Sequence, residues 1–580
     1  MKPLTPAEQS NGGAVDFLQA DRPVPNIASR SRRSFLGKLG GAATMAMATG
    51  AITTLEPLIA GKSGYAEAQE VGPLTDQQRQ AASFNLRVAQ AAIQDNLPLV
   101  SHPDNGDEEL YADKGATFTK CLPHDNFGRV DLNAYASLIN ALSTGNPSDF
   151  NAIPLGGTRT LNNPQAGLAY DLEGTDGHNL AVAPPPVMSG SQLAAELVEM
   201  YWAALLRDLP FINYATNSGA IAAAAELNRL SGYAGPRNGS GQVTTNELFR
   251  GSVTGETVGP YVSQLMILPT ALGAQAMNQR FATYARGVDY LTDFNSYVLI
   301  QNGGSTGDVN VLDPVARYLR DGRDLAAWTH VDVLYQAYFT ALLVLSGIGA
   351  PLNPGNPYVG NPTQAGFGTF GAPDFAATVG EVAQRALQAV WFQKWFVHRR
   401  ARPEVAGAIA HLIKTGQGSE TDVTLSNDVL SSKAIGDIFR EHGSYLLPQA
   451  FPEGSPTHPS YPTGHGMVGG ACITVLKFFF DGTFVFPNPM VPNAAGTALT
   501  PYSGPALTLN AELAKLGHNV TFGHGIHAGI HYRSDSDASL ALGEALAISV
   551  LQDKAPTYNE PFSITITKFD GTTATITNES

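Results

Sequence analysis

The sequence predicts a mainly α-helical protein, in which helix bundles are joined by long loops and a small β-hairpin closes the chain. Three observations predict this class. Segments with apolar residues at helical spacing recur from residue 75 to residue 552. Alternating strand-like text is scarce before residue 563. The 60 glycines and 38 prolines indicate long ordered loops between packed helices.

The first 68 residues are expected to form an export signal. The stretch SRRSFLG contains Arg32 and Arg33, a mildly apolar run follows to about Ala60, and AEA at 66–68 offers a cleavage site. This layout is typical of a twin-arginine signal, although a disordered tail with a chance arginine pair is the alternative. We therefore expect a bacterial protein, exported to the periplasm or beyond the cell, whose mature chain starts near Gln69. No later segment is long and apolar enough to span a bilayer.

The mature chain is expected to divide into three parts. An N-terminal helical part spans 69–375, with helices predicted at 75–96, 191–211, 259–275 and 325–349 and a loop-rich stretch at 97–190. A helix at 375–400 leads into the catalytic bundle of residues 376–556, with further helices at 404–414, 428–441, 468–480, 508–517 and 534–552. Residues 557–580 are expected to form a hairpin that turns at Asp570-Gly571.

Composition excludes some classes of partner. With 43% hydrophobic and 15% charged residues the chain is globular, and its formal net charge of −15 argues against nucleic acid. Cys121 and Cys472 allow at most one disulfide, and the apolar run around Cys472 favours a buried free thiol. Nine of the thirteen histidines lie at or beyond His398, so we expect the chemistry in the last third of the chain.

Two segments of that third offer donors for an oxyanion. Lys394 and Arg402 lie eight residues apart in KWFVHRRARPE, close to two helical turns, so they can share one face. A solvated basic helix end is the competing interpretation, which the flanking apolar text weakens. In PTHPSYPTGHGMVGGA, prolines and glycines indicate a bent loop that opens a helix, where the hydroxyl of Thr463 and the amides of Gly464 and His465 can bind an anion.

A third segment, TFGHGIHAGIHYRSDSD, supplies an oriented imidazole. Asp535 follows His531 by four residues, a spacing that lets a carboxylate on a helix orient the ring. A single histidine in apolar text is more often structural, but the three segments together favour a common site.

In this order and at these spacings, the segments resemble the superfamily of vanadium-dependent haloperoxidases and type 2 phosphatidic acid phosphatases. That superfamily carries a Lys-to-Arg-Pro segment, a Pro-Ser-Gly-His loop, and an arginine followed six residues later by a histidine. The upstream stretches ELVEMYWAALLRDLPF and DGRDLAAWTHVDVLYQAYF look like the bacterial and algal bromoperoxidase branch, so the resemblance covers most of the mature chain. The eight-residue Lys–Arg spacing and His458, seven residues before His465, mark the same branch.

The resemblance implies an enzyme that oxidises bromide or iodide with hydrogen peroxide to hypohalous acid, which halogenates small organic acceptors. It also implies a role for each residue of the site. Vanadate oxygens would be bound by Lys394, Arg402, Thr463 and Gly464. His531 would be the axial ligand to vanadium, fixed by Asp535. His465 would be the acid–base group, and His458 would tune its protonation or the halide preference.

Two positions depart from the family pattern. Thr463 replaces a serine and keeps the hydroxyl. Gly525 stands six residues before His531, where an arginine is expected. His524 or His527 would then take over the contact to vanadate, or a one-residue shift would leave the pocket to Arg533.

Other functions stay open at this point. The same scaffold can act as a phosphohydrolase, with the axial histidine as nucleophile and His465 as general acid. His524, His527 and His531 could instead share a helix face and bind zinc or nickel, although the neighbouring glycines disfavour a regular helix. A weakly active homologue with a depleted vanadate site, or a purely structural one, is a further alternative. The resemblance implies a homo-oligomer, a dimer or larger, with an interface from the long apolar helices; calcium, which some relatives carry, stays open.

Overall fold

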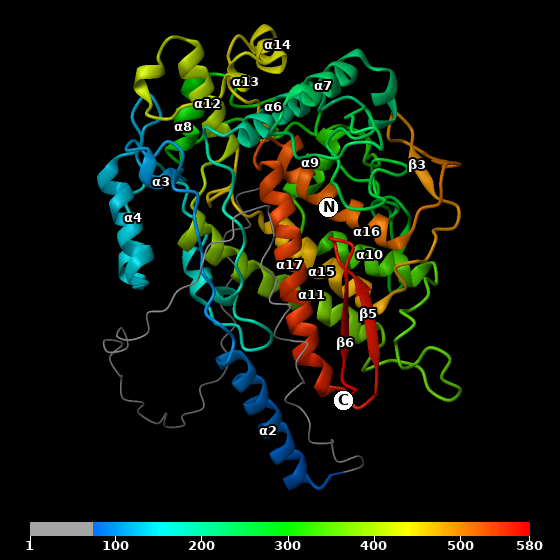
Figure 1. The fold of residues 1–580 in the computed structure, drawn as a ribbon. Coiled ribbons are helices and arrows are strands. Elements are labelled where there is room, and N and C mark those ends of the chain that lie inside the picture. The colour runs from blue at the N-terminus through cyan, green and yellow to red at the C-terminus, as the bar shows by residue number, and fades with distance from the viewer. Residues whose placement is uncertain (1–73, 580) are drawn as a thin grey trace, which may run out of the picture. The chain divides into compact units, whose positions relative to one another are not determined.

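The computed structural model describes residues 74–579, and helix α15 (Gly464–Phe479) lies at its centre, buried along its whole length. Helices α17 (Arg533–Lys554), α11 (Ala372–Phe392) and α16 (Leu509–Phe522) pack around it (Figure 1). Glycines allow the closest approach, because a Cβ at Gly470 would lie 1.9 Å from the carbonyl oxygen of Leu540 on α17. This close packing explains why a glycine-rich segment forms a helix although glycine disfavours one.

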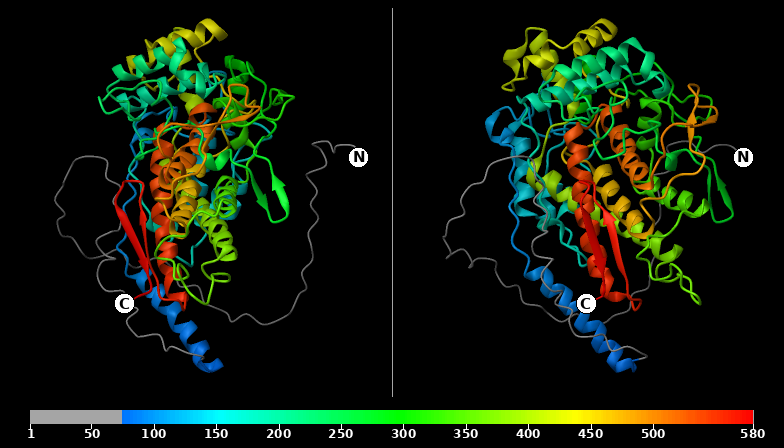
Figure 2. Two further views of the ribbon diagram at one scale, coloured as in Figure 1. Left: turned by 90° about the vertical axis from the view of Figure 1, so that its right-hand side faces the viewer. Right: turned by 45° about the vertical axis from the view of Figure 1, so that its right-hand side comes forward.

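Most of the remaining helices lie around this centre, but α2 (Asp76–Asp95) buries none of its residues and projects away from it (Figures 1 and 2). Before α11 they are α2, α3 (Asp107–Leu110), α4 (Leu132–Thr144), α5 (Pro147–Asn151), α6 (Ser191–Leu205), α7 (Ser218–Arg229), α8 (Phe294–Gln301), α9 (Gly322–His330) and α10 (Gln336–Gly347). Between α11 and α15 they are α12 (Pro403–Lys414), α13 (Asn427–Leu430) and α14 (Lys433–His442). Short 3-10 turns are η2 (Pro164–Leu168), η3 (Gly177–Asn179), η4 (Phe211–Thr216), η5 (Gln264–Met266), η7 (Gly418–Glu420) and η9 (Ala555–Thr557).

Two long helices end in a π-helical turn. The turn η6 (Gln393–His398) follows α11 directly, and η8 (Gly523–His527) follows α16 directly. A π-turn contains one more residue per hydrogen-bonded loop than an α-turn, so the side chains that follow it face a different side of the helix. Such turns are frequent at functional sites.

The strands form three antiparallel hairpins. They pair β1 (Thr270–Leu272) with β2 (Gln275–Met277), β3 (Met490–Pro492) with β4 (Leu499–Pro501), and β5 (Ser563–Thr567) with β6 (Thr573–Thr577). In the C-terminal hairpin Ile564 pairs with Ile576, and both are buried on the face that packs beside α15 and α17. Gly571 adopts a left-handed φ of 83° in its turn, as the Asp-Gly signal predicts.

These features confirm the predicted class, a mainly helical protein with a C-terminal hairpin. Cys121 and Cys472 are both buried free thiols, as expected for Cys472. Within residues 74–579, no helix has the length and apolar character needed to cross a membrane. The predicted twin-arginine signal lies outside the described residues, and the part boundaries at 68, 375 and 556 stay predictions.

Several predicted elements were wrong in detail. Residues 259–275 form no long helix, because Pro269 interrupts the apolar run and the chain turns into the first hairpin. The helix expected at 325–349 is broken between α9 and α10, where Asp332 turns toward the centre of the molecule. The loop around His465 is helical, since α15 begins at Gly464 directly after Pro462 and Thr463. Helices α4 and α7 were not predicted.

Candidate anion-binding site

The structure brings the three predicted segments together at the N-terminus of α15. Lys394 comes from the π-turn η6, Arg402 is the residue before α12, and His531 lies in the short loop before α17. Lys394 and Arg402 do not share a helix face, as the eight-residue spacing suggested. The helix ends at His398, Arg399 adopts a left-handed φ of 36°, and the chain reverses before Arg402. Lys394 and Arg402 therefore do lie at the same site, as predicted, but a reversal of the chain brings them together and not a shared helix face.

Lys394 and Arg402 are two buried positive charges. They are 0% and 1% exposed, and neither forms an ion pair with a carboxylate anywhere in residues 74–579. Burial, and then the neighbouring Arg402, lowers the pKa of Lys394 well below its usual value. Burial also lowers the pKa of Arg402 to about 10. Uncompensated buried charge is costly, so this pair provides a strong driving force for binding an anion.

Both cations keep a donor free. The Lys394 ammonium donates to the carbonyl oxygens of Pro459 and Ser460, each at 2.8 Å, which uses two of its three N–H groups. Arg402 donates from Nε and Nη2 to the carbonyl oxygen and Nδ1 of His458, both at 3.0 Å. Its Nη1 donates to the carbonyl oxygen of Ile530 at 2.9 Å and to Nε2 of His531 at 2.8 Å. One N–H of each cation is left for a ligand.

The first turn of α15 adds further donors. The Thr463 hydroxyl is buried and has no hydrogen-bond partner in the part of the chain that the structure describes. Its side chain does not cap the helix, so the amides of the first turn, including those of Gly464 and His465, lack this usual acceptor. A helix N-terminus with free amides and an orphaned hydroxyl is suited to bind an oxyanion.

His531 presents a lone pair to the same place. Its Nδ1 lies 2.9 Å from Oδ2 of Asp535, as the spacing of four residues predicted. Arginine can only donate, so the contact from Arg402 identifies Nε2 as the unprotonated nitrogen, with the proton on Nδ1. Burial, followed by the charge of Arg402, lowers the pKa of His531 well below its usual value. The ring is therefore neutral, and a metal bound to Nε2 would replace the hydrogen bond that Nε2 accepts from Arg402.

Asp535 is itself held from several sides. It accepts from the Arg400 guanidinium at 2.6 Å, the Ser460 hydroxyl at 2.6 Å and the amide of Tyr532 at 3.1 Å. Arg400 also lies over the ring of Tyr532, 4.0 Å from its centre. This network fixes the carboxylate and, through it, the orientation of His531.

His465 is paired with a carboxylate that the sequence analysis missed. Its Nε2 lies 3.0 Å from Oδ1 of Asp332, whose side chain is 3% exposed and which belongs to the break between α9 and α10. The ring of His465 packs on that of His524, with centroids 4.0 Å apart. Asp332 lay within a predicted continuous helix, and no local motif distinguished it from a residue on a helix surface.

His458 lies on the other side of Arg402. It accepts from the guanidinium through Nδ1, and its ring packs against Trp391 with centroids 4.7 Å apart. Burial, and then the charges of Arg402 and Lys394, lowers the pKa of His458 well below its usual value. The neutral ring of His458 therefore contacts the Arg402 guanidinium and not the ring of His465.

His527 and Arg533, two of the residues considered as replacements for the missing arginine, lie outside the site. The ring of His527 contacts the Tyr261 hydroxyl at 3.0 Å and packs beside Phe249. The guanidinium of Arg533 is paired with Glu199 and donates to the carbonyl oxygen of Arg250 at 2.8 Å. His524 and His531 do not converge with His527, and residues 74–579 contain no group of three histidine, cysteine or acidic side chains arranged to hold a metal. The alternative prediction of a zinc or nickel site is therefore wrong.

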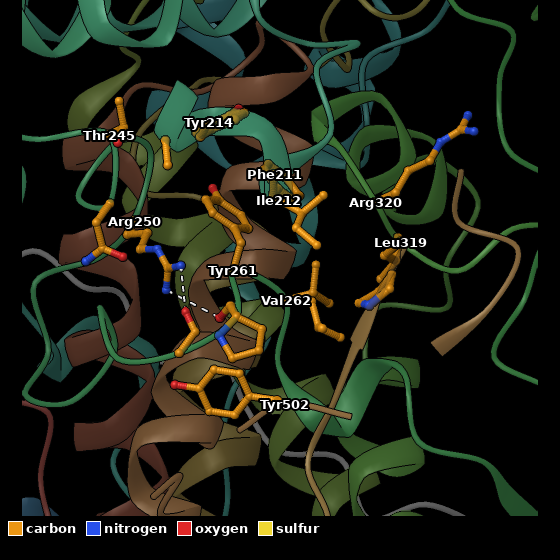
Figure 3. Close-up of a pocket in the computed structure, with 16 residues that line it drawn as sticks. Phe211, Ile212, Tyr214, Thr245, Arg250, Tyr261, Val262, Leu319, Arg320 and Tyr502 are labelled. Atoms are coloured by element: carbon orange, nitrogen blue, oxygen red, sulfur yellow. Dashed lines mark hydrogen bonds between the residues drawn. The ribbon is translucent and has the colours of Figure 1, made fainter. Parts of the chain in front are cut away.

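A cavity of about 210 Å³ reaches the site. It is lined by the end of α9, the π-turn η8 and several loops, among them Arg159, His330, Phe451, Glu453, Thr457 and His524. A larger cavity of about 490 Å³ is lined by Phe211, Tyr214, Arg250, Tyr261 and Tyr502 (Figure 3). The larger cavity contains none of the predicted site residues, so we assign the approach to the anion site to the smaller one.

Comparisons with known proteins agree with the resemblance. The vanadium-dependent bromoperoxidase of Ascophyllum nodosum is 34% identical over 521 residues, covering 86% of this chain and 92% of that protein. The vanadium-dependent bromoperoxidase of Corallina pilulifera is 33% identical over 592 residues, covering 86% of this chain and 99% of that protein. The homohexameric structure of the second vanadate-dependent bromoperoxidase of Ascophyllum nodosum superimposes with a TM-score of 0.82 at 29% identity, covering 92% of this chain and 94% of that one. No protein-family model matches the chain.

Proposed function

The chain belongs to the vanadium-dependent haloperoxidase family, and we propose that it oxidises bromide or iodide with hydrogen peroxide to hypohalous acid, which then halogenates small organic acceptors. One observation carries the proposal. Two buried cations without carboxylate partners, Lys394 and Arg402, act on a neutral histidine, His531, whose Nε2 accepts from Arg402. This combination binds an oxyanion whose central atom is a metal.

The residues present fit vanadate. An isostere of phosphate requires dense donors, which the free N–H groups of Lys394 and Arg402, the Thr463 hydroxyl and the amide of Gly464 supply. His531 would bind the metal through Nε2, with Asp535 holding the proton on Nδ1. Bound vanadate supplies a Lewis acid that activates hydrogen peroxide for attack by halide.

His465 would move the protons of this reaction. Asp332 binds its Nε2, so Nδ1 is the ring nitrogen left for proton exchange at the site. A general acid–base group contributes about two to four orders of magnitude in rate when it is correctly placed. His458 would act indirectly, because it holds the Arg402 guanidinium against His531.

One assay separates this function from the phosphatase alternative, which would use the same cations. Purified apo-protein is given peroxide and either bromide or iodide, with and without added vanadate, and bromination or iodination of phenol red is followed. Hydrolysis of p-nitrophenyl phosphate is measured on the same preparation. A vanadate-dependent halogenation rate supports the proposal; hydrolysis without halogenation by either halide would overturn it.

We further propose that the protein works as an exported homo-oligomer. The second vanadate-dependent bromoperoxidase of Ascophyllum nodosum is homohexameric, and Arg32 and Arg33 in SRRSFLG support twin-arginine export to the periplasm or the extracellular medium. Light scattering of the purified mature chain tests the first part. Loss of export on replacing both arginines by lysine tests the second.

A further inference from the structure

The π-turn η8 decides which side chain of the segment Gly523–His527 faces the anion site. The family pattern leads one to expect a cationic side chain at position 525, six residues before His531. In this chain the extra residue of the π-turn changes the register between α16 and His531. Position 524 therefore points to the site, and position 525 does not.

Gly525 faces the backbone of His531. A Cβ at this position would lie 3.1 Å from Cβ of His531 and 3.4 Å from its carbonyl oxygen. The carbonyl oxygen of Gly525 also accepts from the amides of Gly529 and Ile530, both at 2.9 Å, which fixes the loop that carries His531. An arginine here would push against this loop instead of reaching a ligand.

His524 faces the site directly. Its ring lies 4.0 Å from the ring of His465 and 6.0 Å from that of His531, centroid to centroid. The side chain is 8% exposed, and its Nδ1 is buried without a hydrogen-bond partner in the described part of the chain. A buried unpaired ring nitrogen is costly unless a ligand or a water binds it.

The cavity of about 210 Å³ lies beside this ring. His524 lines it together with Arg159, Phe451 and Glu453. A side chain longer than histidine at position 524 can therefore extend into existing space. At position 525, by contrast, a Cβ would already press against His531.

We propose that His524 is a further side chain that binds the vanadate, at the place where the family pattern has an arginine, and that it makes the site weaker than a guanidinium would. This inference rests on the proposed function. Lys394 and Arg402 then remain the only lysine and arginine among the residues proposed to bind the vanadate. A hydrogen bond to an ionic group contributes about 1.5–3 kcal/mol, which corresponds to roughly ten- to a hundredfold in affinity.

The test is calorimetric titration of orthovanadate into apo-protein, which needs no turnover. His524→Arg should bind vanadate roughly tenfold or more tightly, and His524→Leu roughly tenfold or more weakly. His524→Gln keeps a donor at the same site and should lose less than His524→Leu. The matched control is His527→Gln in the same π-turn, whose affinity should stay within about twofold of wild type because His527 faces Tyr261.

Gly525→Arg provides the decisive comparison. It should lower the melting temperature and weaken vanadate binding, because its side chain meets His531. Tighter binding by Gly525→Arg, or equal affinities for wild type and the folded His524 variants, would overturn the inference while leaving the proposed function intact. If His524→Arg does not fold, the comparison of His524→Gln with His524→Leu decides. If wild type itself fails to bind vanadate, both proposals fall.

Discussion

The Nε2 atom of His465 lies 3.0 Å from the carboxylate oxygen of Asp332, a residue from a break between two helices more than one hundred positions earlier in the chain. The carboxylate fixes the ring in one orientation and leaves Nδ1 for proton exchange. Asp332 therefore acts through His465, as a positioning residue.

We expect Asp332→Asn to lower kcat about ten- to a hundredfold, the usual cost of removing a residue that orients a catalytic or metal-binding histidine. The KM for peroxide and the affinity for vanadate should change little, because Asp332 contacts neither Lys394 nor Arg402. Steady-state kinetics and vanadate titration measure both quantities on one preparation. An equal loss of vanadate affinity and kcat would show that Asp332 supports the anion site as a whole.

His531→Ala should abolish both vanadium retention and halogenation. Arg402 donates to two unprotonated ring nitrogens, Nε2 of His531 and Nδ1 of His458. The nitrogen of His458 lies on the opposite side of the guanidinium, so it cannot replace Nε2 of His531 as the ligand. Metal analysis after dialysis against vanadate-free buffer measures retention. The assignment of the ligand is wrong if the variant still holds one vanadium per chain, and circular dichroism provides the check that it is folded.

The local part of this site was predictable from the sequence. His531 and Asp535 are four residues apart on one segment, and the geometry follows from the start of a helix. Thr463 and Gly464 follow a proline and open an apolar helix, which is a recognisable anion-binding signal. In both cases the determining contacts lie within one turn of the chain.

The non-local part was not predictable. Asp332 reaches His465 only because α9 and α10 are separated, and the break is stabilised by contacts far away in sequence. The choice between His524 and Gly525 depends on a π-turn, whose register is set by packing of α9 against η8. A hydrophobic period of 3.6 residues contains no information on one inserted residue, so the sequence favoured His524 but left His527 and Arg533 open as alternatives.

Thr463→Val should weaken vanadate binding by about three- to tenfold, since it removes a neutral hydroxyl donor while preserving shape. The hydroxyl has no other partner among residues 74–579, so its loss should cost no internal hydrogen bond. The matched control is Thr463→Ser, which keeps the donor and should bind like wild type. The melting temperature of apo-Thr463→Val should be equal to or above that of wild type, and a large decrease would indicate an internal role for the hydroxyl.

The last prediction concerns stability and a histidine outside the anion site. His518 on α16 lies 2.9 Å from Glu256 and 3.1 Å from Asp537. Burial by itself lowers its pKa, but Glu256 and Asp537 outweigh burial and raise the pKa to about 10. The folded protein therefore binds a proton here that the unfolded chain releases near pH 6.5. Linkage requires that this stabilisation is complete below about pH 6.5 and is lost as the pH rises through about 10.

We expect His518→Gln to be less stable than wild type at pH 6, with a deficit that shrinks steadily between about pH 6.5 and 10. Each pKa unit corresponds to about 1.4 kcal/mol, so the change should amount to several kcal/mol. Urea denaturation of apo-protein at pH 6, 7.5, 9 and 10 measures the free energy of unfolding of both proteins. His411→Gln is the control. Burial lowers the pKa of His411, so protonation of this histidine opposes folding, whereas protonation of His518 favours it. A deficit in His518→Gln that stays constant across this range would mean that the histidine is neutral in the folded protein.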